Sequence, residues 1–228
     1  MRAEKSRAPR PRLVEVVGPA GSGKSTLVRS MPARHPARCG WLSLWGLPLP
    51  SLLAGAIALV PTALKAALRG RPLRFAELAQ MARLEALARR IDRLPPDAPP
   101  LVVLDEGPVF GLTWLDVFFG RNGDPGWTAW RRRAVAEWAA RLDAVLCLDA
   151  DDRVLIRRIR ERSQDHMVKD RPEPEIRAFT ARFRQSYDRV LRDLASSGRP
   201  AVLCLRTDDE NPDARWVLGA LEEALRER

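Results

Sequence analysis

The sequence predicts an α/β domain with a parallel five-stranded sheet between two layers of helices. Short apolar runs alternate with longer segments of helical periodicity, which is typical of a sheet whose crossovers are helices. The apolar runs are almost continuous, as expected for strands covered on both faces. The predicted strands are Leu13–Val17, Gly40–Leu44, Leu101–Leu104, Ala144–Leu148 and Ala201–Leu205.

Helical patterns fill the gaps between these strands. The first predicted helix runs from about Lys24 to Ser30 and stops at Pro32. A later helix carries Trp127, Trp130 and Trp138 at helical spacing, which indicates core packing. The other predicted helices cover about 75–94, 154–159 and 176–194, and a last one begins at the N-cap Asn211.

The composition fits one domain that binds small anions. The chain has 228 residues and a net charge of 39 − 29 = +10, and all but four of its 39 basic residues are Arg. The positive charge is spread over helix faces, so we expect nucleotides rather than nucleic acid as partners. The three cysteines show no metal-binding spacing and fit a reducing cytoplasm. We expect residues 1–11 to be a disordered basic arm and 12–228 to be the domain.

Residues 41–64 contain no charged side chain. The segment is long enough to span a bilayer. Pro48, Pro50 and Pro61 interrupt it, which leaves about ten residues of uninterrupted helix over 51–60. We therefore expect a buried core helix or the wall of a substrate pocket, with shallow membrane association as the alternative that is not favoured.

The first strand leads into GPAGSGKST, which matches the phosphate-loop pattern G-x-x-x-x-G-K-[ST] in full. Its glycines let successive N–H groups point at phosphate oxygens, and the following helix adds its positive end. Lys24 is expected to reach the β- and γ-phosphates of ATP, and the Ser25 hydroxyl to bind Mg²⁺. The predicted nucleotide-binding residues are Gly18, Pro19, Ala20, Gly21, Ser22, Gly23, Lys24, Ser25 and Thr26.

Asp105 ends the apolar run LVVLD. Proteins with a phosphate loop pair it with an acid at the end of a neighbouring strand, which holds Mg²⁺ directly or through water. We therefore predict Ser25 and Asp105 as the metal ligands.

The order of these segments resembles the thymidylate kinase and deoxynucleoside kinase branch of the nucleoside-monophosphate kinase fold. The resemblance covers about 12–227 and rests on VVGPAGSGKSTL, LVVLDEG, LDADDRVLIRRIRER and AVLCLRTDDENPD. It implies a three-layer P-loop NTPase fold, ATP, Mg²⁺ and phosphoryl transfer. It also implies an Arg-bearing lid over about 158–172, in which Arg158 and Arg162 neutralise the transferring phosphoryl group. By position alone, Lys169 would lie near the phosphates, and Thr207 and Asp208 beside adenine.

The chain departs from that branch at Glu106, where thymidylate kinases carry an Arg that binds the acceptor phosphate. A carboxylate there would repel a monophosphate, so we expect an acceptor hydroxyl on a neutral or cationic molecule. Glu106 could accept the hydroxyl proton as general base. It could instead activate water, or pair with Arg121 or a helix Arg without a chemical role.

We expect the acceptor pocket to be built from two apolar segments, 41–64 and the predicted loop 111–127, which lie beyond the second and third predicted strands. Glu15, an acid within the first strand, is expected to orient part of the site or to pair with a buried Arg. The predicted function is an ATP-dependent kinase with a small-molecule acceptor. A regulatory P-loop ATPase that acts on a protein partner is the alternative, followed by a polynucleotide 5′-hydroxyl kinase, and a homodimer is left open.

Overall fold

The five predicted strands form one parallel sheet in the order β2-β3-β1-β4-β5. The computed structural model describes residues 10–34, 39–121, 123–197 and 199–208, with a few positions between 217 and 224. Each strand begins and ends within one residue of its predicted bounds. The strands are β1 (Arg12–Val17), β2 (Cys39–Ser43), β3 (Leu101–Asp105), β4 (Ala144–Asp149) and β5 (Ala201–Arg206).

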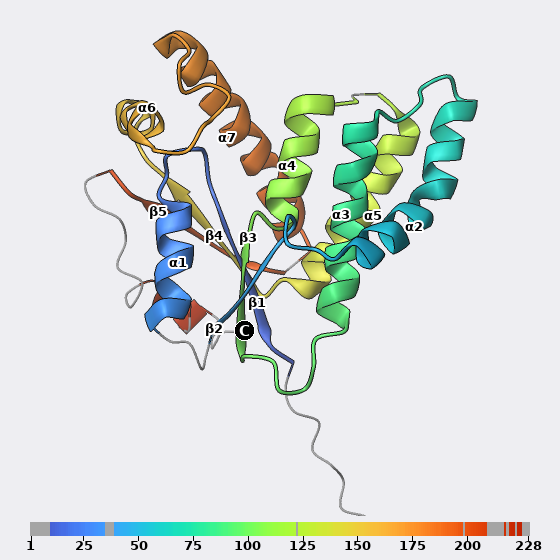
Figure 1. Cartoon of the computed structure of the whole chain (residues 1–228), viewed down its shortest axis with the longest axis horizontal. Helices are drawn as coiled ribbons and strands as arrows, with labels where there is room; N and C mark the ends of the chain where they lie inside the picture. Colours follow the sequence, from blue (N-terminus) through green and yellow to red (C-terminus); the bar gives the residue numbers. More distant parts are fainter. Residues whose placement is uncertain are drawn as a thin grey trace, which may run out of the picture.

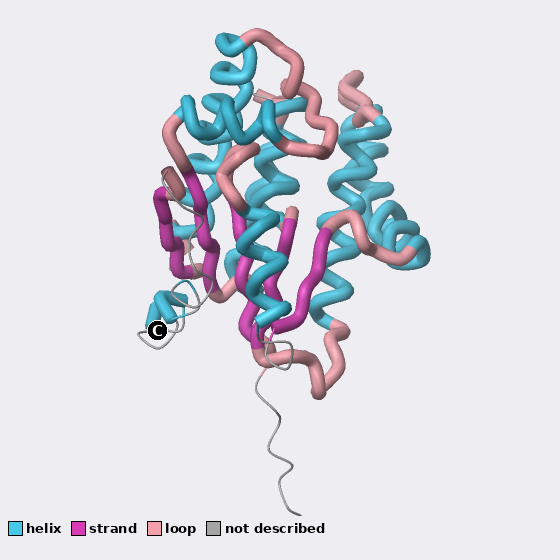
Figure 2. The backbone as a smooth tube through the Cα atoms, turned by 60° about the vertical axis from the view of Figure 1, so that its left-hand side comes forward, coloured by secondary structure: helices cyan, strands magenta, loops and turns pink. Residues whose placement is uncertain are grey.

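Helices cover both faces of this sheet (Figures 1 and 2). The side chains of β1 show the two layers, since Leu13 and Val17 join the core with the long helices. Val14 and Val16 pack with the first helix on the other face. The helices are α1 (Lys24–Arg34), α2 (Leu49–Leu68), α3 (Phe75–Asp92), α4 (Pro108–Phe119), α5 (Pro125–Arg141), α6 (Asp152–Glu161) and α7 (Glu173–Ala195).

The prediction for residues 41–64 is wrong in both length and burial. Helix α2 is 20 residues long and continues through Pro61. Pro48 is its N-cap and Pro50 lies in its first turn, where a backbone N–H has no helical partner to lose. Only Gly55 and Leu59 are buried, so α2 is not a core helix, although its length and composition would suit a membrane span. The first helix likewise continues past Pro32 to Arg34.

The prediction of an apolar loop over 111–127 is also wrong. Most of this segment belongs to α4, which begins with Pro108 after the N-cap Gly107. Helix α4 carries apolar side chains on nearly every side, so its sequence lacks the polar and apolar alternation that marks an amphipathic helix. Helix α5 then begins after Asp124, whose carboxylate accepts from the N–H groups of Gly126 and Trp127.

The tryptophans of α5 are buried in the main core, as predicted. Residues 1–9 of the expected basic arm lie outside the described residues, as does the predicted helix start at Asn211. Arg10 already belongs to the domain, because its guanidinium donates to Asp143 over 2.9 Å.

Candidate active site

The phosphate loop joins the carboxyl end of β1 to the start of α1, as its motif requires. Gly18 and Gly21 have φ angles of 145° and 84°, which side chains disfavour. A Cβ on Gly18 would lie only 2.0 Å from the carbonyl oxygen of Leu148. The loop therefore passes too close to β4 for any other residue at this position.

Lys24 opens α1 and folds over the loop. Its Nζ donates to the carbonyl oxygens of Gly18 and Pro19 over 2.7 and 2.8 Å. Burial lowers its pKa from 10.5 to about 8, although Asp105 and Glu106 favour its charged form. The ammonium group thus lies in the phosphate-binding turn with two carboxylates close by.

Asp105 lies beside the phosphate loop because of the sheet order. Strand β3 pairs with β1 so that Asp105 stands opposite Val16, just before the loop. Burial raises the pKa of this carboxyl group, while Lys24 and Arg29 lower it. Asp105 and Ser25, the two predicted metal ligands, line the same cavity.

Glu106 has a left-handed backbone with a φ angle of 53°, which is rare for a residue with a side chain. Burial, and then the charge of Asp105, raise the pKa of its carboxyl group. The charge of Lys24 lowers this pKa, and Trp45 lowers it further. Such strained, partly desolvated groups are concentrated at functional sites.

The predicted alternative in which Glu106 pairs with Arg121 is wrong. Arg121 binds the fully buried carboxylate of Glu77, with its Nε 2.8 Å from an oxygen. Within the described residues, Glu106 forms no ion pair. Its roles as general base or water activator both stay open.

Glu15 has a structural role next to Glu106. Its buried carboxylate accepts from the N–H groups of Val109 and Phe110 over 2.8 and 2.9 Å, at the N-terminus of α4. Burial raises its pKa to about 8, while these N–H donors lower it. Glu15 therefore fixes the turn that contains Glu106, and it pairs with no Arg among the described residues.

A cavity of about 600 Å³ extends from the phosphate loop and both acids to an aromatic wall. Half of that wall comes from α4, which overlaps the predicted acceptor segment 111–127. The other predicted segment, 41–64, contributes no residue to this cavity, so the prediction that it forms a pocket wall here is wrong. The other half comes from α7, which the sequence predicted only as a helix over about 176–194. The aromatic wall consists of Phe110, Trp114, Phe118, Phe179, Phe183 and Tyr187.

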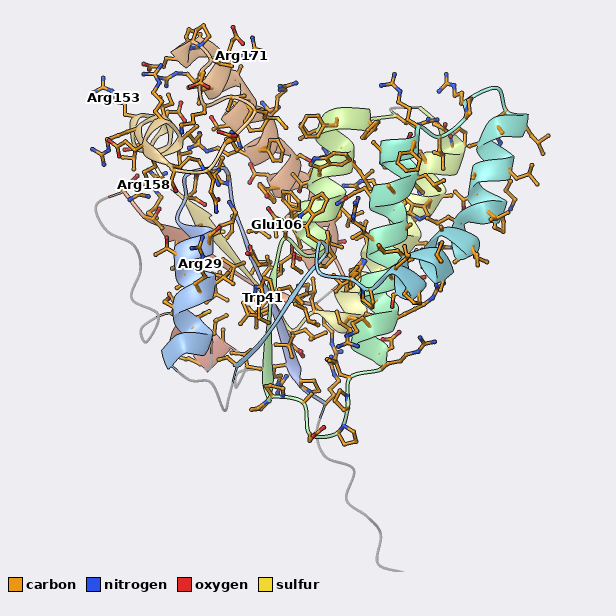
Figure 3. The ribbon with its side chains drawn as sticks, viewed as in Figure 1. Arg29, Trp41, Glu106, Arg153, Arg158 and Arg171 are labelled. Carbon is orange, nitrogen blue, oxygen red and sulfur yellow. The ribbon has the colours of Figure 1, made fainter. Side chains whose placement is uncertain are left out.

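The predicted lid residues do not all face this cavity. Arg158 and Arg162 line it, and Arg158 also donates to the carbonyl oxygen of Thr207 over 2.7 Å. Figure 3 shows Arg158 beneath α6 and Glu106 at the upper end of β3, across the carboxyl end of the sheet. Lys169 instead donates to the carbonyl oxygen of Arg162 over 2.7 Å and braces the lid turn.

Two further predicted residues have structural contacts. The hydroxyl of buried Thr207 donates to the carbonyl oxygen of Ser22, and Asp208 accepts from the N–H of Asp151. The sequence did not indicate the contact between Arg184 on α7 and Asp149. The Nε of Arg184 lies 3.0 Å from both carboxylate oxygens of Asp149. In so Arg-rich a chain nothing singles out Arg184 before the fold is known.

The oxygen donors of the cavity suit Mg²⁺, which prefers carboxylate, hydroxyl and phosphate oxygens in octahedral geometry. Ser25 and Asp105 would hold it, with phosphate and water oxygens completing the shell. No group of three or more His, Cys, Asp or Glu side chains that could hold a metal occurs in the described ranges.

A sequence-family model described as an AAA ATPase domain matches residues 2–117, just over half of the chain. The chain belongs to the AAA ATPase domain family. The matched part of this ATPase-family chain includes the phosphate loop, Asp105 and Glu106. No curated protein sequence matches the chain.

The solved structures that share the fold include two of deoxyadenosine kinase from M. mycoides. One, with the products dCMP and a flexible dCDP, has a TM-score of 0.51 at 13% identity and covers 94% of this chain and 98% of its own. The other, with bound dCTP, has a TM-score of 0.52 at 13% identity, covering 92% and 99%. The predicted P-loop kinase fold is thereby confirmed.

Proposed function

We propose that this protein transfers the γ-phosphate of ATP to a hydroxyl group of a small organic acceptor, with Mg²⁺. The observation that carries the proposal is that one cavity holds the phosphate loop, Glu106 and an aromatic wall. Hydrolysis requires room for water alone. An extended aromatic wall beside the phosphate loop instead suits the body of an organic molecule.

The donor side is formed by the phosphate loop. Its N–H groups and Lys24 would hold the phosphates of ATP, and Ser25 and Asp105 would hold Mg²⁺. The metal ion supplies charge neutralisation of the phosphate oxygens when it is bound. Arg158 and Arg162 line the same cavity, and Arg158 donates to the carbonyl oxygen of Gly21 in the phosphate loop. Both would stabilise charge on the transferring group as the lid closes.

The acceptor side is formed by Glu106. Its carboxylate takes the proton of the acceptor hydroxyl, whose oxygen forms a bond to the γ-phosphorus. The bond from that phosphorus to the β,γ-bridging oxygen breaks, and ADP leaves with the electron pair. Burial raises the pKa of Glu106 toward the working pH, which strengthens it as a base.

The cavity also limits the class of acceptor. Phe110, Trp114 and Phe118 would contact a flat or apolar body, while the neighbouring acids disfavour a phosphate group. Nucleosides combine such a body with a free hydroxyl. They are the first class to test, since deoxyadenosine kinase from M. mycoides shares the fold.

The test is an acceptor screen with γ-labelled ATP and Mg²⁺ over nucleosides, sugars, aromatic alcohols and nucleoside monophosphates. We expect a labelled phosphate ester that Lys24→Ala abolishes and Lys65→Ala leaves unchanged. Lys65 is a suitable control because it is exposed on α2, away from the cavity. Absence of ATP binding, or activity unchanged in Lys24→Ala, would refute the proposal, and a preference for monophosphates would refute the role assigned to Glu106.

The alternative is an ATPase that acts on a protein partner. It is favoured by the AAA ATPase family match together with the adjacent acids Asp105 and Glu106, since Glu106 could equally activate water. Hydrolysis of ATP without acceptor separates the two functions. Turnover that needs no acceptor and that a protein accelerates would support the ATPase.

A further inference from the structure

Helix α2 exposes an apolar stripe along its whole length. The stripe consists of side chains spaced three or four residues apart, each between 57% and 79% exposed, namely Leu49, Leu53, Ile57, Val60, Leu64 and Leu68. This spacing is that of a helix seam which packs against another helix. In Figure 1, α2 lies at the edge of the molecule farthest from β5, where a partner has free access.

The opposite face of α2 is fixed to the domain. A Cβ on Gly55 would lie 2.3 Å from the carbonyl oxygen of Ala82 on α3, so the two helix backbones are in close contact. Leu59, on the same side, is fully buried. The stripe is therefore a preformed surface that binds without rearrangement.

The charges around α2 favour a protein helix over a lipid surface. Helices that lie on membranes carry Lys and Arg along their polar face. In α2 the face opposite the stripe is packed on α3. The only charged residue of α2 is Lys65, near its C-terminal end. No Asp or Glu occurs between Val16 and Ala76, so this region offers no ion pair to a basic partner. The uncharged stripe of α2 therefore matches a partner surface that also carries no charge, such as the same stripe of a second copy.

We infer that α2 forms the interface of a homodimer, in which the stripes of two copies pack antiparallel about a twofold axis. In this orientation the basic residues at the C-terminal end, Lys65 and Arg69, lie about 20 to 30 Å from their counterparts, beyond the Debye length. A parallel pair would place them side by side. A twofold pair also closes on itself and leaves no apolar surface for further growth.

The area of the stripe matches this partner. Each of its six side chains exposes on the order of 100 Å² of apolar surface. The total approaches the roughly 800 Å² per partner of a standard protein interface. Apolar patches above about 300–600 Å² are uncommon on monomers.

The first test measures mass in solution by sedimentation or light scattering from about 1 to 100 µM. We expect a dimer for the wild type and at least about a 100-fold weaker dimer for Ile57→Asp, which counts twice across the twofold axis. Ala58→Asp, on the same helix but off the stripe, is the matched control and should remain dimeric. Circular dichroism and ATP binding check that both variants stay folded, since both side chains are exposed.

The second test fixes the orientation by disulfide formation in a Cys204→Ser background. Ile57 lies near the middle of α2, so Ile57→Cys should link to itself across the axis. Leu49→Cys and Leu68→Cys should link to each other in a mixture but not to themselves. Self-linking of the end variants would indicate a parallel pair and overturn the antiparallel one.

A wild type that is monomeric at 100 µM would overturn the dimer, as would a dimer that survives Ile57→Asp. A monomer that binds vesicles of anionic phospholipid would assign the stripe to a membrane instead. The proposal is independent of the reaction, because a dimer can form whether or not phosphate is transferred.

Discussion

Helices α2 and α4 follow the neighbouring strands β2 and β3, and each contains a single charged residue, yet they face opposite surroundings. In α4 the first turns are buried, and Phe110, Trp114 and Phe118 line the cavity. In α2 only two residues are buried and the apolar stripe is exposed. Apolar composition thus indicates that a helix face is to be covered, but not whether a ligand, the core or another molecule covers it.

The two helices are also attached differently. Glu15 holds the N-terminus of α4 through two backbone N–H groups, next to Glu106. Gly55 holds the middle of α2 through backbone contact with α3. Substitutions in α4 should therefore change the reaction, whereas substitutions in α2 should change stability or assembly.

The largest effect is expected at the turn before α4. Glu106→Gln keeps the size of the side chain but cannot take a proton, so kcat for phosphate transfer should fall about 10²–10⁴-fold. The KM for ATP should stay near that of the wild type in steady-state assays. Glu175→Gln, at an exposed position on α7, is the control. An unchanged kcat in Glu106→Gln would contradict the assignment of Glu106 as the general base.

A smaller effect is expected when equivalent apolar contacts are removed from the two helices. Trp114→Ala takes away part of the aromatic wall and should raise the KM for the acceptor about 10–100-fold. Leu53→Ala on α2 should leave this KM unchanged, since Leu53 faces away from the cavity. Equal effects in acceptor titrations would contradict the assignment of α4 to the acceptor.

Replacing a glycine should change the stability of the protein differently in the two helices. Gly55→Ala drives a methyl group into backbone and should lower the free energy of unfolding in urea by about 1–3 kcal/mol. Gly111→Ala on α4 meets only the ends of Leu84, Leu44 and Gln80, and a helix propensity gain of about 1 kcal/mol offsets the crowding. The free energy of unfolding of Gly111→Ala should therefore be close to that of the wild type.

Gly46→Ala is the control for these glycine variants, because its Cβ would contact nothing within 4 Å. A Gly111→Ala variant less stable than Gly55→Ala would contradict the close approach of α2 to α3.

The smallest effect concerns pH. The pKa of Lys24 is lowered to about 8, and only its protonated form attracts phosphates. The value of kcat/KM for ATP should therefore be constant below about pH 8 and fall about 10-fold per unit above it. Lys24→Arg keeps its charge and should abolish this fall, whereas dimerisation through the uncharged stripe should not change between pH 7 and 9. A kcat/KM that is flat to pH 9.5 in the wild type would contradict the lowered pKa.

The sequence predicts the sheet and the donor side of the site because both depend on local patterns. Apolar runs define the strands, and the phosphate loop carries its own glycine spacing. The positions of Lys169, Arg184 and the α7 aromatics depend on how distant elements pack, which no local pattern records. The prolines of α2 were misleading because two of the three occupy its first turn or cap, where they cost no hydrogen bond.

The central claim is that phosphate is transferred to an organic hydroxyl in the cavity lined by the phosphate loop and α4, with Glu106 as the base. The most direct measurement follows the label of γ-labelled ATP when the best acceptor of the screen is added to wild type and to Glu106→Gln. We expect the label in an organic phosphate ester for the wild type and a strong loss of that ester in the variant. Label that appears only as inorganic phosphate, at a rate independent of acceptor, would contradict the claim.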